Sequence, residues 1–146
     1  MSLRIVYIWL LVAGSLLSCS AQQEPIIFGT DLCHFCKMTL MDEKFGCELV
    51  TKKGKVFKFD DVNCLLRFMR SGAVAPKDTK ETLVVNFEKK GELLAVSTAS
   101  FIYADYILTP MGSRVAAFSA KEAAVKFNNN RDGKIYTWEE IKKIVP

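Results

Sequence analysis

Histidine is almost absent from this chain, which contains only His34 among its 146 residues. A catalytic zinc site of the three-histidine or two-histidine-and-glutamate type needs at least two histidines, so the sequence excludes both. No serine, histidine and aspartate triad, phosphate-binding glycine loop or dinucleotide fingerprint can be assembled either. We therefore expect a binding protein and not an enzyme.

The chain also lacks an apolar run long enough to cross a bilayer. Its most apolar stretch, Ile5 to Leu17, would measure about 20 Å as a helix, whereas the hydrocarbon core is about 30 Å thick. Such a stretch behind Arg4 and ahead of a polar segment is typical of a cleaved secretory signal. It ends in Leu16 to Cys19, which matches a bacterial lipobox whose cysteine becomes the lipid-modified first residue.

The lipobox divides the chain into three expected parts. Residues 1–18 form the lipoprotein signal peptide, residues 19–30 a lipidated tether, and residues 31–146 one metal-binding domain. Acyl chains on Cys19 hold a soluble domain at a membrane, because each buried CH₂ contributes about 0.8 kcal/mol. We therefore expect the protein in the cell envelope, facing the periplasm, and Ser20 behind the lipidated residue favours the outer membrane.

A dense basic cluster is missing as well. The chain carries 20 lysines and arginines against 16 acidic residues, a formal net charge of +4. Without a concentrated positive track, nucleic acid is not an expected partner.

Sulfur, in contrast, is concentrated near the start of the expected domain. Cys33, Cys36 and Met38 lie within six residues of one another, and thiolate and thioether ligands select soft ions such as Cu(I). The Cys-x-x-Cys spacing lets both thiols reach one ion from a single turn. Lys37 and His34 are candidates for the positive charge that lowers thiol pKa values.

Other residues are candidates for the same site. Met111 stands among the turn formers of residues 109–113, where nothing demands a large apolar side chain. His34 and Cys64 are secondary candidate ligands. Cys47 and Cys64 admit two further readings, a disulfide or the completion of a four-cysteine zinc site with the first pair.

Parts of the sequence also match motifs of three other chemistries. A thiol-disulfide redox pair at Cys33 and Cys36 is an alternative, although such pairs usually begin a helix after a central strand and only a polar tether precedes this one. Covalent haem would require a histidine where Lys37 stands. Residues 128–139 match a calcium-binding loop with asparagine in its first position, but an Asn-rich linker with Asp-Gly before a strand gives the same letters.

The hydrophobic pattern predicts an α+β fold of two similar halves, each an antiparallel hairpin with a helix and a further strand. The expected strands are 45–51, 55–59, 82–87, 93–97, 114–118 and 135–138. Residues 100–108 are left without an assignment.

Three helices are expected. Asp60 or Asp61 caps the first, whose apolar residues follow the helical period, and Gly72 ends it. The second helix is expected to start with a capping box of Ser119 and Glu122, and the third with one of Thr137 and Glu140.

Taken together, the lipobox, the Cys33-x-x-Cys36-Lys37-Met38 motif, the segment Lys58 to Cys64 and the stretch Thr109 to Ser113 resemble the NosL family. Its members are accessory lipoproteins of nitrous oxide reductase. The resemblance implies a Cu(I)-binding chaperone outside the cytoplasm that acts in maturation of the reductase, and hence in denitrification. It also implies delivery of copper through a dedicated ABC-type membrane complex.

The resemblance assigns the copper-binding sulfurs by position. They would be Cys33 or Cys36, or both, together with Met111, and Met38 matches the methionine of the cysteine motif. Lys37 stands where glycine usually precedes that methionine. Whether a homodimer completes the site is left open.

Overall fold

The computed structural model describes residues 23–146. The expected signal peptide, the expected lipidation residue Cys19 and the start of the expected tether lie outside these residues. Within the described part, no helix is both long enough and apolar enough to cross a membrane.

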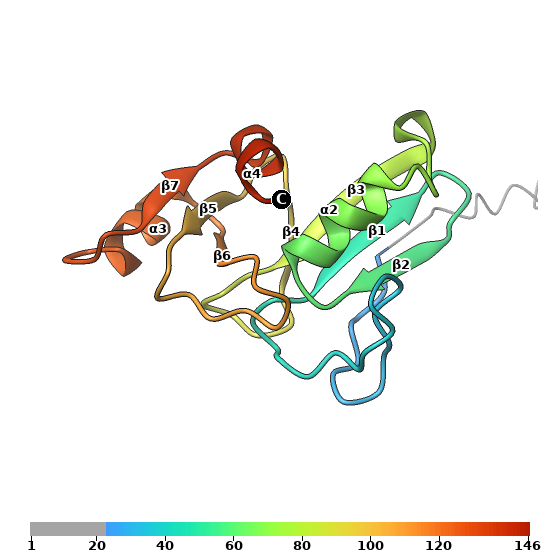
Figure 1. Cartoon of the computed structure of the whole chain (residues 1–146), viewed down its shortest axis with the longest axis horizontal. Helices are drawn as coiled ribbons and strands as arrows, with labels where there is room; N and C mark the ends of the chain where they lie inside the picture. Colours follow the sequence, from blue (N-terminus) through green and yellow to red (C-terminus); the bar gives the residue numbers. More distant parts are fainter. Residues whose placement is uncertain (1–22) are drawn as a thin grey trace, which may run out of the picture.

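The first half is built on a four-stranded antiparallel sheet in the order β2-β1-β3-β4. Its elements are β1 (Cys47–Thr51), β2 (Val56–Phe59), α2 (Val62–Arg70), η1 (Pro76–Asp78), β3 (Thr79–Val85) and β4 (Leu93–Ala95). Helix α2 lies across one face of this sheet (Figure 1).

The second half contains a three-stranded antiparallel sheet in the order β6-β5-β7. Its elements are β5 (Ser100–Tyr103), β6 (Val115–Phe118), α3 (Lys121–Phe127), β7 (Lys134–Tyr136) and α4 (Trp138–Ile144). The two halves stand side by side, and the segment that precedes β1 lies below the first sheet in Figure 1.

Both halves follow the same path. A hairpin (β1-β2 or β5-β6) leads into a helix (α2 or α3), and the next strand (β3 or β7) pairs with the first strand of the hairpin. The predicted α+β architecture of two similar halves is therefore confirmed. The unassigned residues 100–108 contain β5, the central strand of the second sheet, whose four residues give too short a pattern to be recognised.

A shared hydrophobic core explains the packing of the first half. The rings of Phe57 and Phe59 lie 4.8 and 5.0 Å from that of Phe68 on α2. Burying each such side chain contributes about 1.5 to 3 kcal/mol. Strand β5 links the cores, because Phe101 faces the shared core while Ile102 packs in a second cluster with α3.

The helix starts agree in part with the sequence. Asp61, one of the two expected caps, accepts hydrogen bonds from the first turn of α2, and the Thr137–Glu140 capping box is present. The prediction of a Ser119–Glu122 capping box is wrong. Ala120 precedes α3 without a side-chain cap, which places Glu122 one residue too early for a box. Trp138 begins α4 and does not end β7.

Candidate metal centre

Cys33 and Cys36 lie in a tight turn that is fixed at the edge of the first sheet. Within the turn, the Cys33 amide donates to the Met38 carbonyl at 2.8 Å and the Lys37 amide to the Cys33 carbonyl at 3.0 Å. The His34 amide donates to the carbonyl of Lys58 on β2, also at 2.8 Å. The turn therefore presents both thiols from a backbone that the sheet holds in place.

Lys37 keeps this turn closed despite replacing the usual glycine. Its φ of +67° is in the left-handed region that favours glycine. Its ammonium group donates to the His34 carbonyl at 2.8 Å, across the turn. The motif thus retains a geometry suited to glycine, and the lysine adds a hydrogen bond of its own.

Three cysteine sulfurs converge in the folded chain. The Sγ atoms of Cys33, Cys36 and Cys64 all lie within 4.8 Å of one another. Cys33 is fully buried, Cys64 is 1% exposed and Cys36 is half-buried. Two sulfurs come from the turn and the third from the start of α2, and we call this group the cysteine cluster.

The cluster concentrates negative charge on one sulfur. The pKa of Cys33 is lowered, because the Cys64 thiol donates to its sulfur and because backbone N–H groups, including that of Cys36, do the same. The pKa of Cys64 is raised by the neighbouring Cys33 sulfur, and that of Cys36 is raised by burial. The lowered pKa of Cys33 favours a thiolate flanked by two thiols, so a soft cation would displace protons as it binds.

Asp60 is a second acidic group beside this thiolate. It is 4% exposed, and burial, together with repulsion from Cys33, raises its pKa to about 6. A cation bound to the sulfurs would relieve that repulsion.

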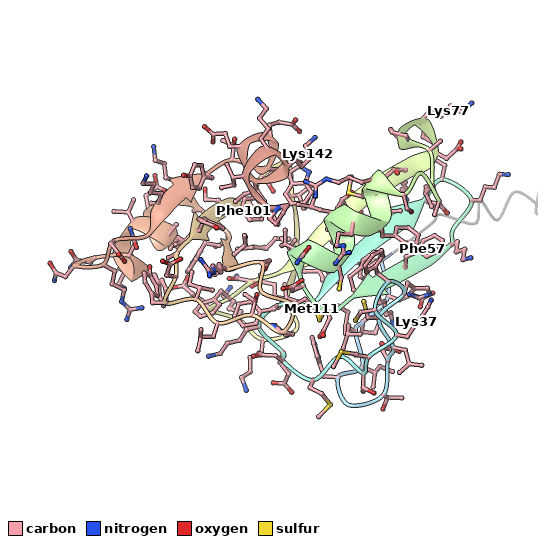
Figure 2. All side chains as sticks on the ribbon, viewed as in Figure 1. Lys37, Phe57, Lys77, Phe101, Met111 and Lys142 are labelled. Carbon is pink, nitrogen blue, oxygen red and sulfur yellow. The ribbon has the colours of Figure 1, made fainter. Side chains whose placement is uncertain are left out.

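Met111 reaches the same region from the second half of the chain. It lies in the β5-β6 connection, and it packs against the core cluster that contains Cys33 and Cys64. Its amide donates to Asp61 at 3.1 Å. Figure 2 shows Met111 beside the lower end of α2.

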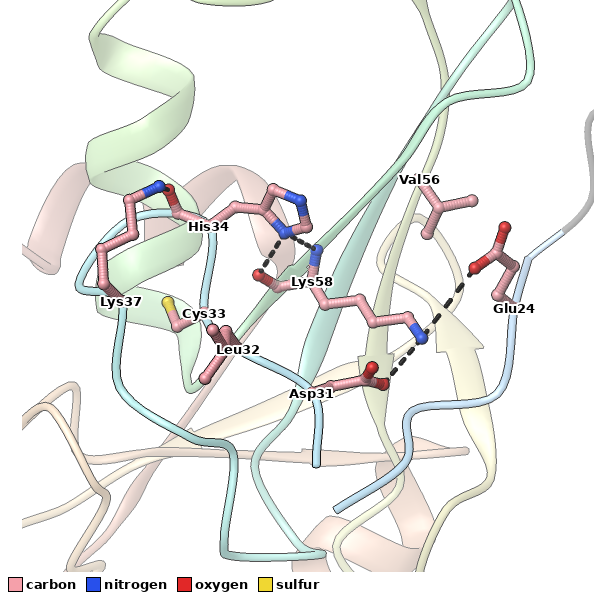
Figure 3. Close-up of a pocket in the computed structure, with 8 residues that line it drawn as sticks. All are labelled: Glu24, Asp31, Leu32, Cys33, His34, Lys37, Val56 and Lys58. Carbon is pink, nitrogen blue, oxygen red and sulfur yellow. Dashed lines mark hydrogen bonds and ion pairs between the residues drawn. The ribbon is translucent and has the colours of Figure 1, made fainter. Parts of the chain in front are cut away.

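Met38 and His34 occupy different surroundings. The side chain of Met38 is 58% exposed, while its amide group partly offsets the rise in the pKa of the Cys36 thiol. His34 Nδ1 accepts a hydrogen bond of 2.9 Å from the Lys58 amide (Figure 3). That nitrogen is thus occupied, and in the described chain His34 is not part of the three-residue group.

Cys47 stays apart from the cluster. It is fully buried, and its thiol donates to the Phe45 carbonyl at 3.4 Å. All four cysteines of the described chain are free, so neither a Cys47–Cys64 disulfide nor a four-cysteine zinc set is formed between residues 23 and 146.

The loop that resembles a calcium site makes its own internal contacts. Asn128 accepts from the Tyr106 hydroxyl at 2.6 Å and donates to the Gly133 carbonyl at 2.6 Å. Glu139, which would be the last ligand, pairs with Lys142 at 2.8 Å. These contacts give the matching residues structural roles in the link between α3 and α4.

An open pocket of about 410 Å³ lies beside the cysteine turn. At its edge, the ammonium group of Lys58 contacts Asp31 at 2.7 Å and Glu24 at 3.9 Å (Figure 3). The pocket thus borders the ion pairs that hold the N-terminal segment against β2.

The sequence ranked Cys64 only as a secondary candidate ligand. It also gave no sign that Asp61 accepts hydrogen bonds from the Met111 segment. Cys64 is separated from the motif by a hairpin, and spacing alone gave it only secondary rank. A usable signal was present, because a thiol three residues after a helix cap lies in the first turn, where amide groups favour anionic ligands.

Comparison with known proteins identifies the family. No curated protein sequence gives a match. Among solved structures, the crystal structure of the copper chaperone NosL from Shewanella denitrificans is similar, with 26% sequence identity and a TM-score of 0.63. The similarity covers 82% of this chain and 95% of that one. The family model of NosL matches residues 26–145, so this chain belongs to the NosL family.

Proposed function

We propose that this protein is a Cu(I) chaperone of the cell envelope, anchored to a membrane through lipid on Cys19. It supplies copper for assembly of the copper centres of nitrous oxide reductase by way of an ABC-type membrane complex. The observation that carries the proposal is the cluster of three cysteine sulfurs within 4.8 Å. Membership of the NosL family and likeness to a copper chaperone support it.

The ligand chemistry favours Cu(I) over zinc. Thiolate and thioether ligands suit a soft monovalent ion, whereas structural zinc almost always takes four ligands. The cluster offers three thiols and a nearby thioether, and Cys47 does not join it.

Exposure of part of the site suits a carrier that must release its ion. Cys33 and Cys64 are buried, Cys36 is half-buried, and Met38 is largely exposed. A partner's ligands can therefore approach the ion from the side of Cys36 and Met38. The buried sulfurs would protect it from water between uptake and release.

The deciding experiment is an anaerobic titration of the reduced protein, lacking residues 1–19, with Cu(I) against a competing chelator. A parallel titration uses Zn(II). One tightly held Cu(I) per chain, or one per dimer, supports the proposal, and the stoichiometry shows whether a homodimer completes the site. Tight zinc without copper would contradict it.

A paired variant tests the sulfurs directly. Cys33→Ser combined with Cys36→Ser should abolish stoichiometric Cu(I) binding while the circular dichroism spectrum stays unchanged. Full copper affinity in that variant would sink the chaperone proposal. A Cys33–Cys36 reduction potential like those of thiol-disulfide oxidoreductases would instead favour the redox alternative.

Anchoring and delivery need a cellular test. Cys19→Ser should stop lipid incorporation and release the protein from the membrane fraction. Fractionation identifies which membrane holds the wild-type protein. Copper loading of the reductase should fall in cells that carry the double cysteine variant, and co-purification should recover the ABC-type complex.

A further inference from the structure

One buried carboxylate joins the two parts of the chain that carry the sulfurs. Asp61 is 1% exposed. Its Oδ1 accepts from the amides of Asn63 at 2.9 Å and Cys64 at 3.2 Å. Its Oδ2 accepts from the amides of Met111 at 3.1 Å and Ser113 at 3.2 Å. A single side chain therefore holds both the start of α2 and the β5-β6 connection.

The residue next to Cys64 strengthens the same link. The side-chain amide of Asn63 donates to the Met111 carbonyl at 2.8 Å. Both backbone polar groups of Met111 are thus bonded to residues that lie within three positions of Cys64. The backbone of Met111 cannot shift relative to Cys64 without breaking these bonds.

We infer that Asp61 is a positioning residue of the metal site, which holds the thioether of Met111 in register with the cysteine cluster. The inference rests on the proposed function. Groups that orient metal ligands typically contribute 10- to 100-fold in metal affinity. Rigid placement of Met111 lowers the conformational cost of bringing a sulfur from the second half to an ion held by the first.

A purely structural role for Asp61 predicts something different. As a helix cap it stabilises the fold by about 1 kcal/mol, and its loss would lower stability without changing copper affinity in the folded protein. The two roles are separable, because serine is also a good helix cap. Its single short oxygen cannot cap the helix and also accept the hydrogen bonds from Met111 and Ser113.

The test is a double-mutant cycle on the purified, reduced protein, with Cu(I) affinity measured by chelator competition. Asp61→Ser should weaken Cu(I) binding by about 10- to 100-fold. Met111→Leu should weaken it to a similar extent, because leucine keeps the volume and removes the sulfur. Adding Asp61→Ser to Met111→Leu should cause no further loss. Thr137→Ala, which removes the cap of α4 and leaves the bonds between Asp61 and the Met111 segment in place, is the matched control and should leave affinity unchanged.

A copper-free measurement supplies an independent readout. Amide hydrogen exchange at Met111 and Ser113 should speed up in Asp61→Ser and stay slow in Thr137→Ala. If Asp61→Ser does not fold, Asn63→Ala removes the bond to the Met111 carbonyl while leaving the cap, and it should weaken copper binding in the same direction.

Failure of this inference differs from failure of the proposed function. A wild-type protein that binds no Cu(I) overturns both. Tight binding by the wild type together with unchanged affinity in Asp61→Ser or Met111→Leu, or with full additivity in the double variant, overturns only the positioning role.

Discussion

The sulfur of Cys64 lies within 4.8 Å of the sulfur of Cys33, which belongs to a turn thirty-one positions earlier in the chain. The contact joins the first turn of α2 to the loop before β1, and both cysteines are buried. It makes Cys64 part of the cluster and gives the cluster a buried side and an open side.

Replacing Cys64 should therefore affect metal binding more than replacing another buried cysteine. We expect Cys64→Ser to weaken Cu(I) binding at least tenfold, about 1.4 kcal/mol, because serine offers a hard oxygen. Cys47→Ser is the control, since Cys47 is equally buried but lies outside the cluster. Chelator competition measures both, and an equal effect of the two variants would remove Cys64 from the ligand set.

Met38 offers a test of the open side. Its thioether is exposed beside Cys36, so Met38→Leu should weaken Cu(I) binding by about tenfold, or 1.4 kcal/mol, with unchanged thermal stability. Met41 is 70% exposed and provides the control, because Met41→Leu alters a methionine that has no assigned role. Equal affinities of wild type and Met38→Leu would show that the motif's methionine is not a ligand.

Lys37→Gly tests whether the turn carries backbone strain. A non-glycine residue in the left-handed region costs about 1 to 2 kcal/mol, whereas glycine loses more entropy on folding and the variant loses the bond to His34. We expect a gain of up to about 1 kcal/mol in unfolding free energy, measured by urea denaturation. Copper affinity should be retained. Lys53→Gly, in the β1-β2 turn, should bring no such gain, and destabilisation by Lys37→Gly would argue that the lysine bond outweighs the strain.

Glu48 should make stability depend on pH. It is fully buried in β1. Burial raises its pKa from 4.5 to about 7. Between these values the unfolded chain has lost the proton that the folded chain keeps, so this contribution to stability is full below pH 4.5 and is lost as pH rises through 7.

Glu48→Gln should remove that dependence. Glutamine stays neutral, so the variant should gain up to about 3 kcal/mol over wild type between pH 4.5 and pH 8. Urea denaturation across this range measures the difference. Glu43→Gln, at an exposed residue that pairs with Lys90 at 3.0 Å, is the control. A constant difference between Glu48→Gln and wild type at every pH would contradict the buried-acid explanation.

Most of the fold was readable from local patterns. Short segments were enough to predict the strands rich in β-branched and aromatic residues. The same holds for the helix that follows Asp61 and for the capping box at Thr137. Strand β5 did not, because its partners β6 and β7 lie elsewhere in the chain and pairing decides its conformation. The start of α3 was misplaced for a related reason, since Ser119 offered a cap that the chain does not use.

The site was predictable in its chemistry and only partly in its geometry. Clustered sulfur indicated a soft metal, and the family resemblance pointed to Met111. Convergence of Cys64 with Cys33, the occupied nitrogen of His34 and the two bonds from the Met111 segment to Asp61 all depend on tertiary contacts. The spacing of residues along the sequence does not reveal such contacts.

The second half of the molecule repeats the path of the first without a single cysteine. Its hydrophobic cluster is formed largely by phenylalanine, isoleucine and alanine side chains. The same path can thus form without thiols, whereas in the first half Cys33, Cys47 and Cys64 pack in the core. The repeated path, and not the chemistry of the cysteine cluster, is therefore what the two halves have in common.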